Sequence, residues 1–185
     1  MSCGKDSYSK ELLTDTLISP FCAEAEFTFS SGEKAVDGTL RVTSGENIRI
    51  DILSPDLLSG ISIISNGAGD MPNYTVSFSG INAEIPKSIL EKLSLSFCLF
   101  SPELPEKIRT LDDTSFSTVS NDESFEVFGL SDISPCTVSF SDGQINYSIT
   151  YDLNTGTPLL MIAGHTDSSS TLKITKFKRD TQNSK

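Results

Sequence analysis

The sequence predicts a β-rich α+β fold in which about ten antiparallel strands form a large sheet. Three observations favour this fold. Short runs of alternating apolar and polar residues dominate the 185-residue chain, and this alternation is typical of half-buried strands. Short turns join most of these runs, and such links permit antiparallel pairing. Helical spacing is confined to the N-terminus and the middle of the chain. A sheet of that size twists, so it either splits into a sandwich or curls around a filler.

Length and charge limit the architecture and the partners. The chain is long enough for one domain with its own core and too short for two. Its 14 basic and 25 acidic residues give a net charge of −11, which repels phosphate backbones and anionic membrane surfaces. We therefore expect one domain and no nucleic-acid partner. No apolar run has the length of a transmembrane helix.

The N-terminal residues resemble the mature start of a bacterial lipoprotein. Cys3 and Gly4 precede the polar segment Lys5–Ser7. In a lipoprotein this cysteine carries the lipid, and the polar residues tether the domain to the membrane surface. The resemblance implies a tether at residues 1–9, a lipid anchor at Cys3, and an extracytoplasmic protein whose signal peptide is absent from this sequence. The alternative is that Cys3 is an ordinary residue of a frayed terminus.

The first elements in chain order are a helix and two strands. Lys10–Ile18 has leucines at helical spacing, and Ser9 can cap its start, so a helix is expected as far as Pro20. The period then changes to two. The apolar positions of the two predicted strands are Ala23, Ala25, Phe27 and Phe29 in the first, and Val36, Gly38, Leu40 and Val42 in the second.

The segment Ile48–Gly67 predicts two strands separated by a kink. Isoleucines alternate with charged residues in its first part, which puts three branched side chains on one face. Pro55 ends this strand, because proline has no N–H and disfavours helix in the residue before it. A second apolar run, Ile61–Ile64, leads to a turn at Asn66 and the glycine after it.

The middle of the chain predicts two further strands and a helix. Tyr74–Ser79 and Ile81–Ile85 alternate, and Pro86 ends the second strand. The apolar residues of Lys87–Phe100 fit either a helical stripe or a strand. We favour a helix for the first half, because Pro86 suits the first helical position.

The last third of the chain predicts a closing series of strands. Glu106–Asp113 is expected to be a polar connection between proline-broken segments, anchored only by Ile108 and Leu111. The predicted strands lie at 115–120, 124–128, 136–140, 145–151, 159–163 and 172–177. Residues 179–185 are expected to be a polar tail.

The sequence predicts no catalytic site, metal or cofactor. His165 is the only histidine, and its neighbourhood GHTDSS is typical of a turn. Asp152, Asn154 and Gly156 resemble the start of a calcium loop, but Ala163 occupies the twelfth position, where a glutamate ligand is needed. No GxSxG, HExxH, P-loop or GxGxxG motif occurs. We therefore expect a protein that is not an enzyme.

The cysteines give no evidence of a zinc site, because none of them forms a CxxC pair. If Cys3 carries a lipid, Cys22, Cys98 and Cys136 remain, and at most one disulfide can form among them. The alternative is that they are small buried side chains.

The order of these elements resembles that of the LolA-like lipoprotein family. The likeness lies in the strand IRIDILSPDLLSGISII followed by NG, and in YDLNTGTPLLMI at a late bend, and it extends over Leu12–Phe177. It implies one LolA-like domain at residues 10–178, with an unclosed barrel whose concave face is covered by helices. It also implies an apolar cavity for acyl chains or a lipid-modified partner, although other proteins of this fold are sensor or adaptor domains.

The resemblance therefore gives two expected functions. The first is a membrane-anchored lipoprotein that binds a lipid, an acyl chain or a lipidated partner, and the second is a sensor or adaptor domain that binds another envelope protein. The cavity residues are expected to be Phe27, Phe29, Leu40, Val42, Ile50, Tyr74, Val76, Phe78, Leu90, Leu93 and Phe97. The alternative is that these side chains fill the space and form an ordinary core. This set includes no ring of positive charge for an anionic headgroup.

Overall fold

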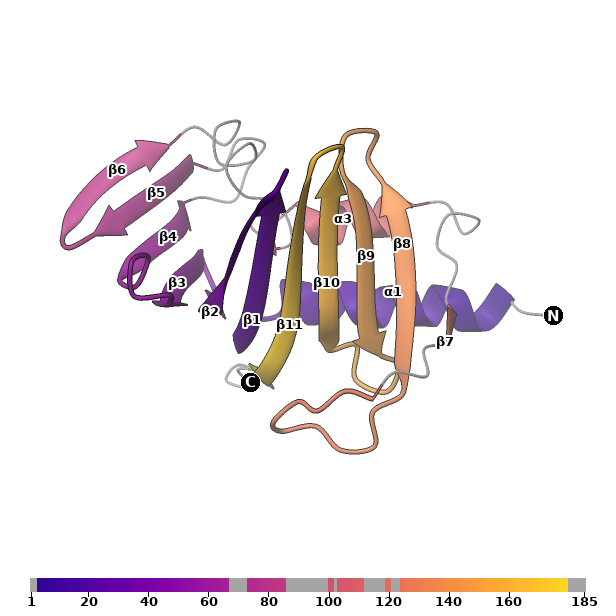
Figure 1. Ribbon diagram of the computed structural model, residues 1–185. Coiled ribbons are helices and arrows are strands. Elements are labelled where there is room, and N and C mark those ends of the chain that lie inside the picture. Colours follow the sequence, from indigo (N-terminus) through magenta and orange to yellow (C-terminus); the bar gives the residue numbers. More distant parts are fainter. Residues whose placement is uncertain are drawn as a thin grey trace.

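The computed structural model describes residues 3–66, 73–85, 100–101, 103–111, 119–120 and 124–179. In this part of the chain, eleven strands form one sheet in the order β6-β5-β4-β3-β2-β1-β11-β10-β9-β8-β7 (Figure 1). Neighbouring strands are antiparallel. The elements are α1 (Cys3–Ile18), β1 (Phe21–Ser31), β2 (Lys34–Ser44), β3 (Ile48–Ser54), β4 (Ile61–Asn66), β5 (Asn73–Phe78), β6 (Ile81–Ile85), α3 (Leu104–Thr110), β7 (Val119–Ser120), β8 (Pro135–Ser141), β9 (Asn146–Asp152), β10 (Pro158–His165) and β11 (Ser168–Arg179).

The sheet does not close into a barrel. Its two edge strands are β6 and β7, which lie at opposite ends of the strand order. The N-terminal strand β1 lies in the middle, because it pairs with β2 on one side and with the C-terminal strand β11 on the other. The predicted fold, a β-rich unclosed sheet with an N-terminal helix and a mid-chain helix, is therefore confirmed.

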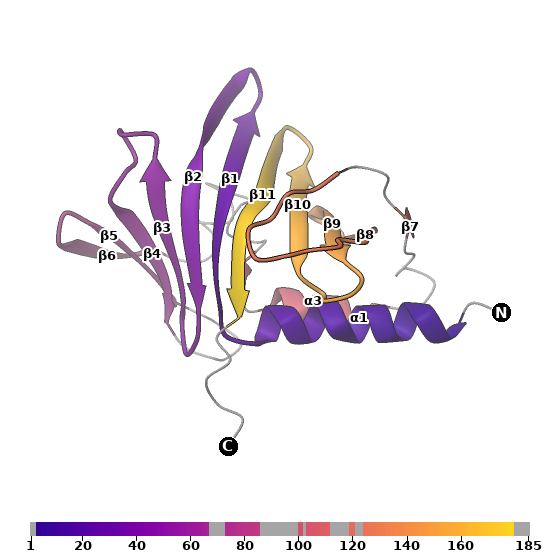
Figure 2. The ribbon, with the colours of Figure 1, turned by 90° about the horizontal axis from the view of Figure 1, so that it is seen from below.

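Both helices lie on one side of the sheet, which we call the inner face. Figure 2 shows α1 and α3 beside the strands β8–β11. The strand β1 illustrates why one face is buried: Phe21, Ala23 and Phe27 are almost inaccessible, whereas Cys22 and Glu26 between them are exposed. The period of two predicted from the sequence therefore separates a core face from a solvent face.

The helix α1 packs closely against the turn between β9 and β10. Leu13 is fully buried, and the Thr16 hydroxyl donates a hydrogen bond to the Thr155 carbonyl over 3.1 Å. Gly156 has φ = +70°, and a Cβ atom at this position would lie 2.4 Å from the carbonyl oxygen of Leu12. Only glycine combines this backbone conformation with so close an approach to a helix.

The helix α3 corrects one prediction. The sequence suggested a polar connection over Glu106–Asp113, but the structure has a helix at Leu104–Thr110 in which Pro105 and Ile108 are buried. Pro105 lies in the first turn, where its missing N–H would have no helical partner, so proline starts this helix instead of breaking it. Ile108 is therefore part of the core.

Other boundaries also differ from the prediction. The helix α1 begins at Cys3, before the predicted start at Lys10, whereas the role of residues 1–9 as a tether stays a prediction. The predicted strand at 124–128 is wrong, because only Phe128 pairs, through a bridge to Lys176. The helix predicted in the first half of Lys87–Phe100 and the start of the strand predicted at 115–120 lie outside the described residues.

Candidate ligand pocket between the helices and the sheet

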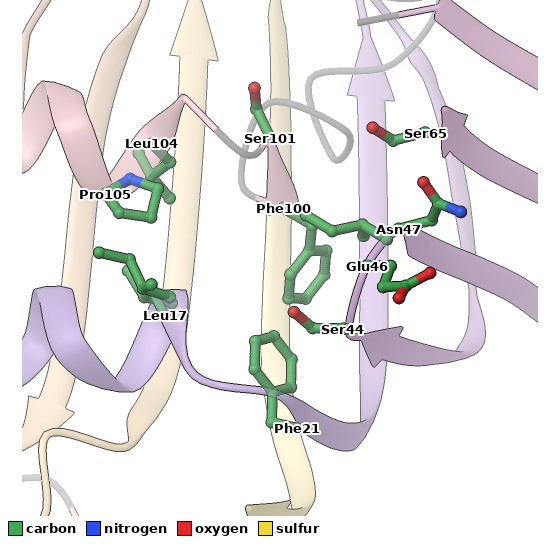
Figure 3. Close-up of a pocket in the computed structure, with 13 residues that line it drawn as sticks. Leu17, Phe21, Ser44, Glu46, Asn47, Ser65, Phe100, Ser101, Leu104 and Pro105 are labelled. Carbon is green, nitrogen blue, oxygen red and sulfur yellow. The ribbon is translucent and has the colours of Figure 1, made fainter. Parts of the chain in front are cut away.

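A partly enclosed pocket of about 200 Å³ lies at the C-terminal end of α1. Four parts of the chain form it: the end of α1 with the start of β1, the turn between β2 and β3, the strand β4, and the start of α3 with the residues before it. Figure 3 shows Leu17 and Leu104 on the helical side, Asn47 and Ser65 on the sheet side, and Phe21 and Phe100 between them.

The apolar wall of the pocket is well ordered by packing. Leu17, Phe21, Phe100 and Leu104 are each less than a tenth exposed. The Phe21 ring stacks on Phe177 of β11, with a centroid separation of 5.2 Å and an interplanar angle of 26°. This stacked pair holds the floor of the pocket in a fixed position.

The opposite wall is polar. Ser44 and Ser65 are buried there, at the end of β2 and in β4. With its amide oriented to donate, the Asn47 side chain lies 3.0 Å from the Ser65 carbonyl and 3.1 Å from the Glu46 carbonyl, and so it fixes the β2–β3 turn to β4. The exposed residue Ile18, which also lines the pocket, is 51% accessible to solvent.

An ion pair fixes α3 beside this pocket. The Lys107 ammonium donates to the Asp142 carboxylate over 2.6 Å, at the turn between β8 and β9. Partial burial raises the pKa of Asp142, but the Lys107 ammonium and the backbone N–H groups of Ile145 and Gln144 outweigh this effect and lower the pKa from 3.8 to about 2. Asp142 is therefore ionised at neutral pH and restrains α3.

The size of the pocket limits what it can bind. Pockets for whole drug-sized ligands usually have about 300–1,000 Å³, and this one has about 200 Å³. It therefore suits one compact apolar group, such as a short stretch of acyl chain or a single apolar side chain. Each methylene buried there contributes about 0.8 kcal/mol.

The residues predicted to line a cavity lie elsewhere. Those that the structure describes do not line this pocket, and they differ in burial. Phe27, Leu40, Val42, Ile50 and Tyr74 are buried, Phe29 and Val76 are half-buried, and Phe78 is 48% exposed. Leu90, Leu93 and Phe97 lie outside the described residues. A ligand role for this set stays a prediction.

The lining residues were missed because no periodic pattern marks them. The pocket forms at element ends, including the turn that follows Ser44 and the residues around Phe100 and Leu104. Sequence periodicity identifies the faces of long elements but not where their ends meet. One usable signal was present: Phe21 directly follows Pro20, just after the end of α1, so a large aromatic side chain stands where the helix meets the sheet.

Neither His165 nor Asp152, the two candidates from the sequence, has a catalytic arrangement among the described residues. His165 is exposed at the end of β10, and within the described residues no hydrogen bond joins it to an acid or hydroxyl group. The buried Asp152 carboxylate accepts hydrogen bonds from the Ser134 N–H (2.9 Å), the Asn154 N–H (3.3 Å) and the Thr155 hydroxyl (2.8 Å). Asp152 therefore stabilises a turn.

The described residues offer neither a metal site nor a membrane-spanning helix. No group of three or more His, Cys, Asp or Glu residues is placed to hold a metal ion in the part of the chain that the structure describes. None of the described helices has the length and hydropathy to cross a membrane.

Cys22 is a free, exposed thiol on β1, and Cys136 is buried on β8, whereas Cys98 lies outside the described ranges.

The sequence matches no protein-family model and no curated protein. Solved structures are similar in fold. An uncharacterized conserved protein from Thermus thermophilus is 12% identical, with 96% of this chain and 88% of that chain covered and a TM-score of 0.51. A DUF1329 family protein from Desulfovibrio piger is 14% identical, with coverage of 97% and 95% and a TM-score of 0.50. A LolA superfamily protein from Nitrosomonas europaea is 10% identical, with coverage of 97% and 95% and a TM-score of 0.49.

At these identities the likeness concerns the fold alone. It extends over nearly the whole chain, in agreement with a single sheet that runs from β1 to β11. The architecture expected from the sequence is confirmed: the described residues form an unclosed antiparallel sheet with an N-terminal helix and a mid-chain helix. A LolA superfamily protein is among the solved structures of similar fold.

Proposed function

We propose that this protein is an extracytoplasmic, non-enzymatic binding protein that holds one apolar group in the pocket between α1, α3 and the sheet. The observation that carries the proposal is the combination of a buried apolar wall, formed by Leu17, Phe21, Phe100 and Leu104, with a lining residue, Ile18, that is exposed to solvent. Apolar surface that remains accessible inside a packed domain favours an apolar ligand, because burial removes it from water.

The ligand class that fits best is an acyl chain. Most polar lining residues, Ser44, Glu46, Asn47 and Ser65, lie on the sheet side, and Ser101 lies before α3. A chain can therefore place its methylenes against the apolar wall and direct its polar end away from that wall. The volume of about 200 Å³ accepts only part of a long chain. We therefore expect the remainder of a natural ligand to stay outside the pocket.

A series of neutral alkanols tests this function. From butanol to decanol, each added methylene is expected to tighten binding about fourfold, which corresponds to about 0.8 kcal/mol, until the pocket is full. Longer chains are then expected to bind with constant affinity. Calorimetric titration measures the series, and binding that is absent, or that strengthens without a plateau, contradicts the proposed pocket.

A matched pair of variants locates the binding. Ile18→Asp places a charge at the mouth on a residue that is already 51% exposed, so the fold is expected to persist. Alkanol affinity is expected to fall about tenfold. Leu53→Asp makes the same kind of change on a residue of β3 that is 39% exposed and does not line the pocket, and it is expected to leave the affinity unchanged. Equal losses in both variants would place the ligand elsewhere.

A protein partner is the second candidate, and the small volume of the pocket favours it. A space of about 200 Å³ also fits one large apolar side chain of another envelope protein, in the manner of an interface anchor. A peptide partner is expected to compete with octanol for the pocket. Ile18→Asp is expected to lower the affinity for the peptide and for octanol alike. A partner that binds equally well in the presence of saturating octanol would exclude this pocket as its site.

The membrane anchor is a separate part of the proposal. Cys3 and Gly4 give the sequence support for lipidation, and Cys3 is also the first residue of α1. A lipid there would hold the domain at the membrane surface through its N-terminal helix. Mass spectrometry of the N-terminal peptide from the protein's own cells is expected to show an acylated cysteine. A Cys3→Ser variant is expected to leave the membrane fraction, and an unmodified Cys3 in the wild type would refute the anchor.

A further inference from the structure

A second hollow lies where the strand β11 extends beyond β10. Within the described residues, β10 pairs with β11 only as far as Lys173, whereas β1 pairs with β11 as far as Arg179. The segment before β8 takes the place beside this extension: the Phe128 N–H donates to the Thr175 carbonyl over 2.9 Å. Figure 2 shows this segment, the orange loop between β7 and β8, beside β10 and β11.

The β11 groove, as we call it, lies between Phe128–Leu130, the end of β11 and the β9–β10 turn, and it has about 640 Å³. That volume lies within the range of ordinary small-molecule sites. It shares no lining residue with the pocket described above. The stacked rings of Phe21, which lines the first pocket, and Phe177, which lines the groove, lie between the two. A hollow of about 210 Å³ adjoins both, because Phe21 and Ser44 line it together with Lys178 and Arg179.

One part of the groove is apolar. Phe177 and Leu130 contribute to its lining, and Phe128 is 78% exposed. A phenyl ring held in water at the rim of a hollow offers a surface that an apolar ligand can cover. The backbone hydrogen bond of Phe128 to β11 keeps this ring beside the groove.

The other part is cationic, in a chain whose net charge is −11. Lys176, Lys178 and Arg179 line it, and Glu24 is its one acidic lining residue among those that the structure describes. Glu24 pairs with Lys176 at 2.6 Å and with Arg41 at 2.9 Å, and these hydrogen bonds, that of Lys176 first, lower its pKa. One carboxylate therefore balances two cations on the strands around it.

Two positive charges remain without an acidic partner among the described residues. Lys178 is exposed and forms no hydrogen bond or ion pair within that part of the chain. The Arg179 guanidinium donates to the Thr16 hydroxyl and to the Thr155 carbonyl, which are both neutral acceptors. Lys178 and Arg179 are consecutive in β11, so their side chains leave the strand on opposite faces, and both line the groove. An anion at the end of this strand lies in the positive field of both charges.

We propose that the β11 groove binds an amphiphilic anion, with its apolar body against Phe128, Leu130 and Phe177 and its carboxylate or phosphate beside Lys178 and Arg179. This site is independent of the pocket proposed for neutral apolar groups. Its ligand chemistry is that of a fatty acid or of a single-chain lipid phosphate. The affinity depends on both halves of the ligand, because neither an exposed ion pair nor one exposed ring binds tightly alone.

Calorimetric titration below the micelle concentration tests the charge requirement. Laurate and dodecyl phosphate are the two anionic probes, and dodecanol is the neutral one. At least one anion is expected to bind about tenfold more tightly to the groove than dodecanol does, with an affinity that falls as salt is added. A preference for carboxylate or for phosphate identifies the source of the ligand. Equal affinity for all three probes would overturn the proposal.

Variants on the same strand locate the anion. Lys178→Glu reverses an exposed charge in the groove and is expected to weaken laurate binding about tenfold. Lys173→Glu makes the same change on an exposed residue of β11 that does not line the groove, and it is expected to leave the affinity unchanged. Phe128→Ser is expected to weaken laurate and dodecyl phosphate alike. Equal effects of Lys178→Glu and Lys173→Glu would refute the site.

Cys22 provides a direct readout of occupancy. Its exposed thiol lines the groove, so a bound ligand is expected to slow its alkylation by a maleimide severalfold. Peptide-resolved mass spectrometry separates Cys22 from the other cysteines. Protection by laurate that is lost in Lys178→Glu supports the proposal, and laurate binding without protection of Cys22 would overturn it.

Discussion

Replacing Gly156 by alanine tests how the N-terminal helix is joined to the sheet. The residue has φ = +70°, and an added Cβ atom would lie 2.4 Å from the Leu12 carbonyl oxygen and 2.7 Å from the Thr16 hydroxyl oxygen. A side chain in the left-handed conformation costs about 1–2 kcal/mol, and forcing an extra methyl group into a packed contact adds about 1–3 kcal/mol. We therefore expect Gly156→Ala to lower the free energy of unfolding by about 3 kcal/mol.

Gly143 provides the matched control. It has φ = +89° in the β8–β9 turn, and a Cβ atom there would have no neighbour within 4 Å. Gly143→Ala is expected to cost about 1 kcal/mol, the conformational part alone. Urea denaturation followed by circular dichroism measures both losses. If they are equal, the contact between Gly156 and α1 does not contribute to stability, and our account of how α1 is held would be wrong.

Three further predictions concern single contacts in the fold. The lowered pKa of Asp142 means that its ion pair with Lys107 contributes stability above pH 3.8, and this stability is lost as the pH falls through about 2. Asp142→Asn is expected to remove this pH dependence, which is measured by acid titrations of unfolding. The effect is expected to be only about 1 kcal/mol, because solvent screens the partly exposed pair. Asp152→Ala is expected to lower the free energy of unfolding by about 2–4 kcal/mol, because a buried carboxylate that accepts three hydrogen bonds is lost. Asp152→Asn is expected to cost less than half as much. Equal shifts of the melting temperature in the two variants would contradict the role given to these hydrogen bonds. Gly38→Ala is expected to destabilise the protein by more than about 2 kcal/mol in a denaturation experiment, because the added Cβ would lie 2.1 Å from the Ser54 carbonyl oxygen. Gly45→Ala is the control: a Cβ there would have no neighbour within 4 Å, so the change in stability is expected to be less than about 1 kcal/mol.

The strands were predictable because their signal is local. Alternation in Ala23–Phe29 and in the two arms around Gly143 follows from the geometry of a strand, which places successive side chains on opposite faces. The predicted hairpin at Gly143 and the predicted break at Pro55 are both present. Such features depend on a few consecutive residues, so a single sequence is enough to find them.

The helix α3 was not predictable in the same way. Its sequence LPEKIRT is short and contains proline, which indicates a break as readily as a helix start. The decision was made by burial: Ile108 and Leu104 pack into the core, and Lys107 reaches the β8–β9 turn. Those partners are distant in the sequence, so no local pattern contains them.

The cationic groove shows the same limit more clearly. Lys176, Lys178 and Arg179 are near the C-terminus, where Arg179 was assigned to a polar tail. In the structure β11 continues to Arg179, because β1 pairs with it along its whole length. The positive charge that the predicted cavity lacked therefore lies at a different hollow, beside Phe128.

By itself, the sequence determined that this chain forms antiparallel strands with a helix before them, because the alternation of side chains, the turn residues and the prolines act over a few residues at a time. Only the tertiary structure decided that these strands form one sheet, where that sheet leaves space and which charges surround that space. The physical reason is that a hollow is what remains after segments far apart in the chain have packed, and its volume and charge depend on all of them together.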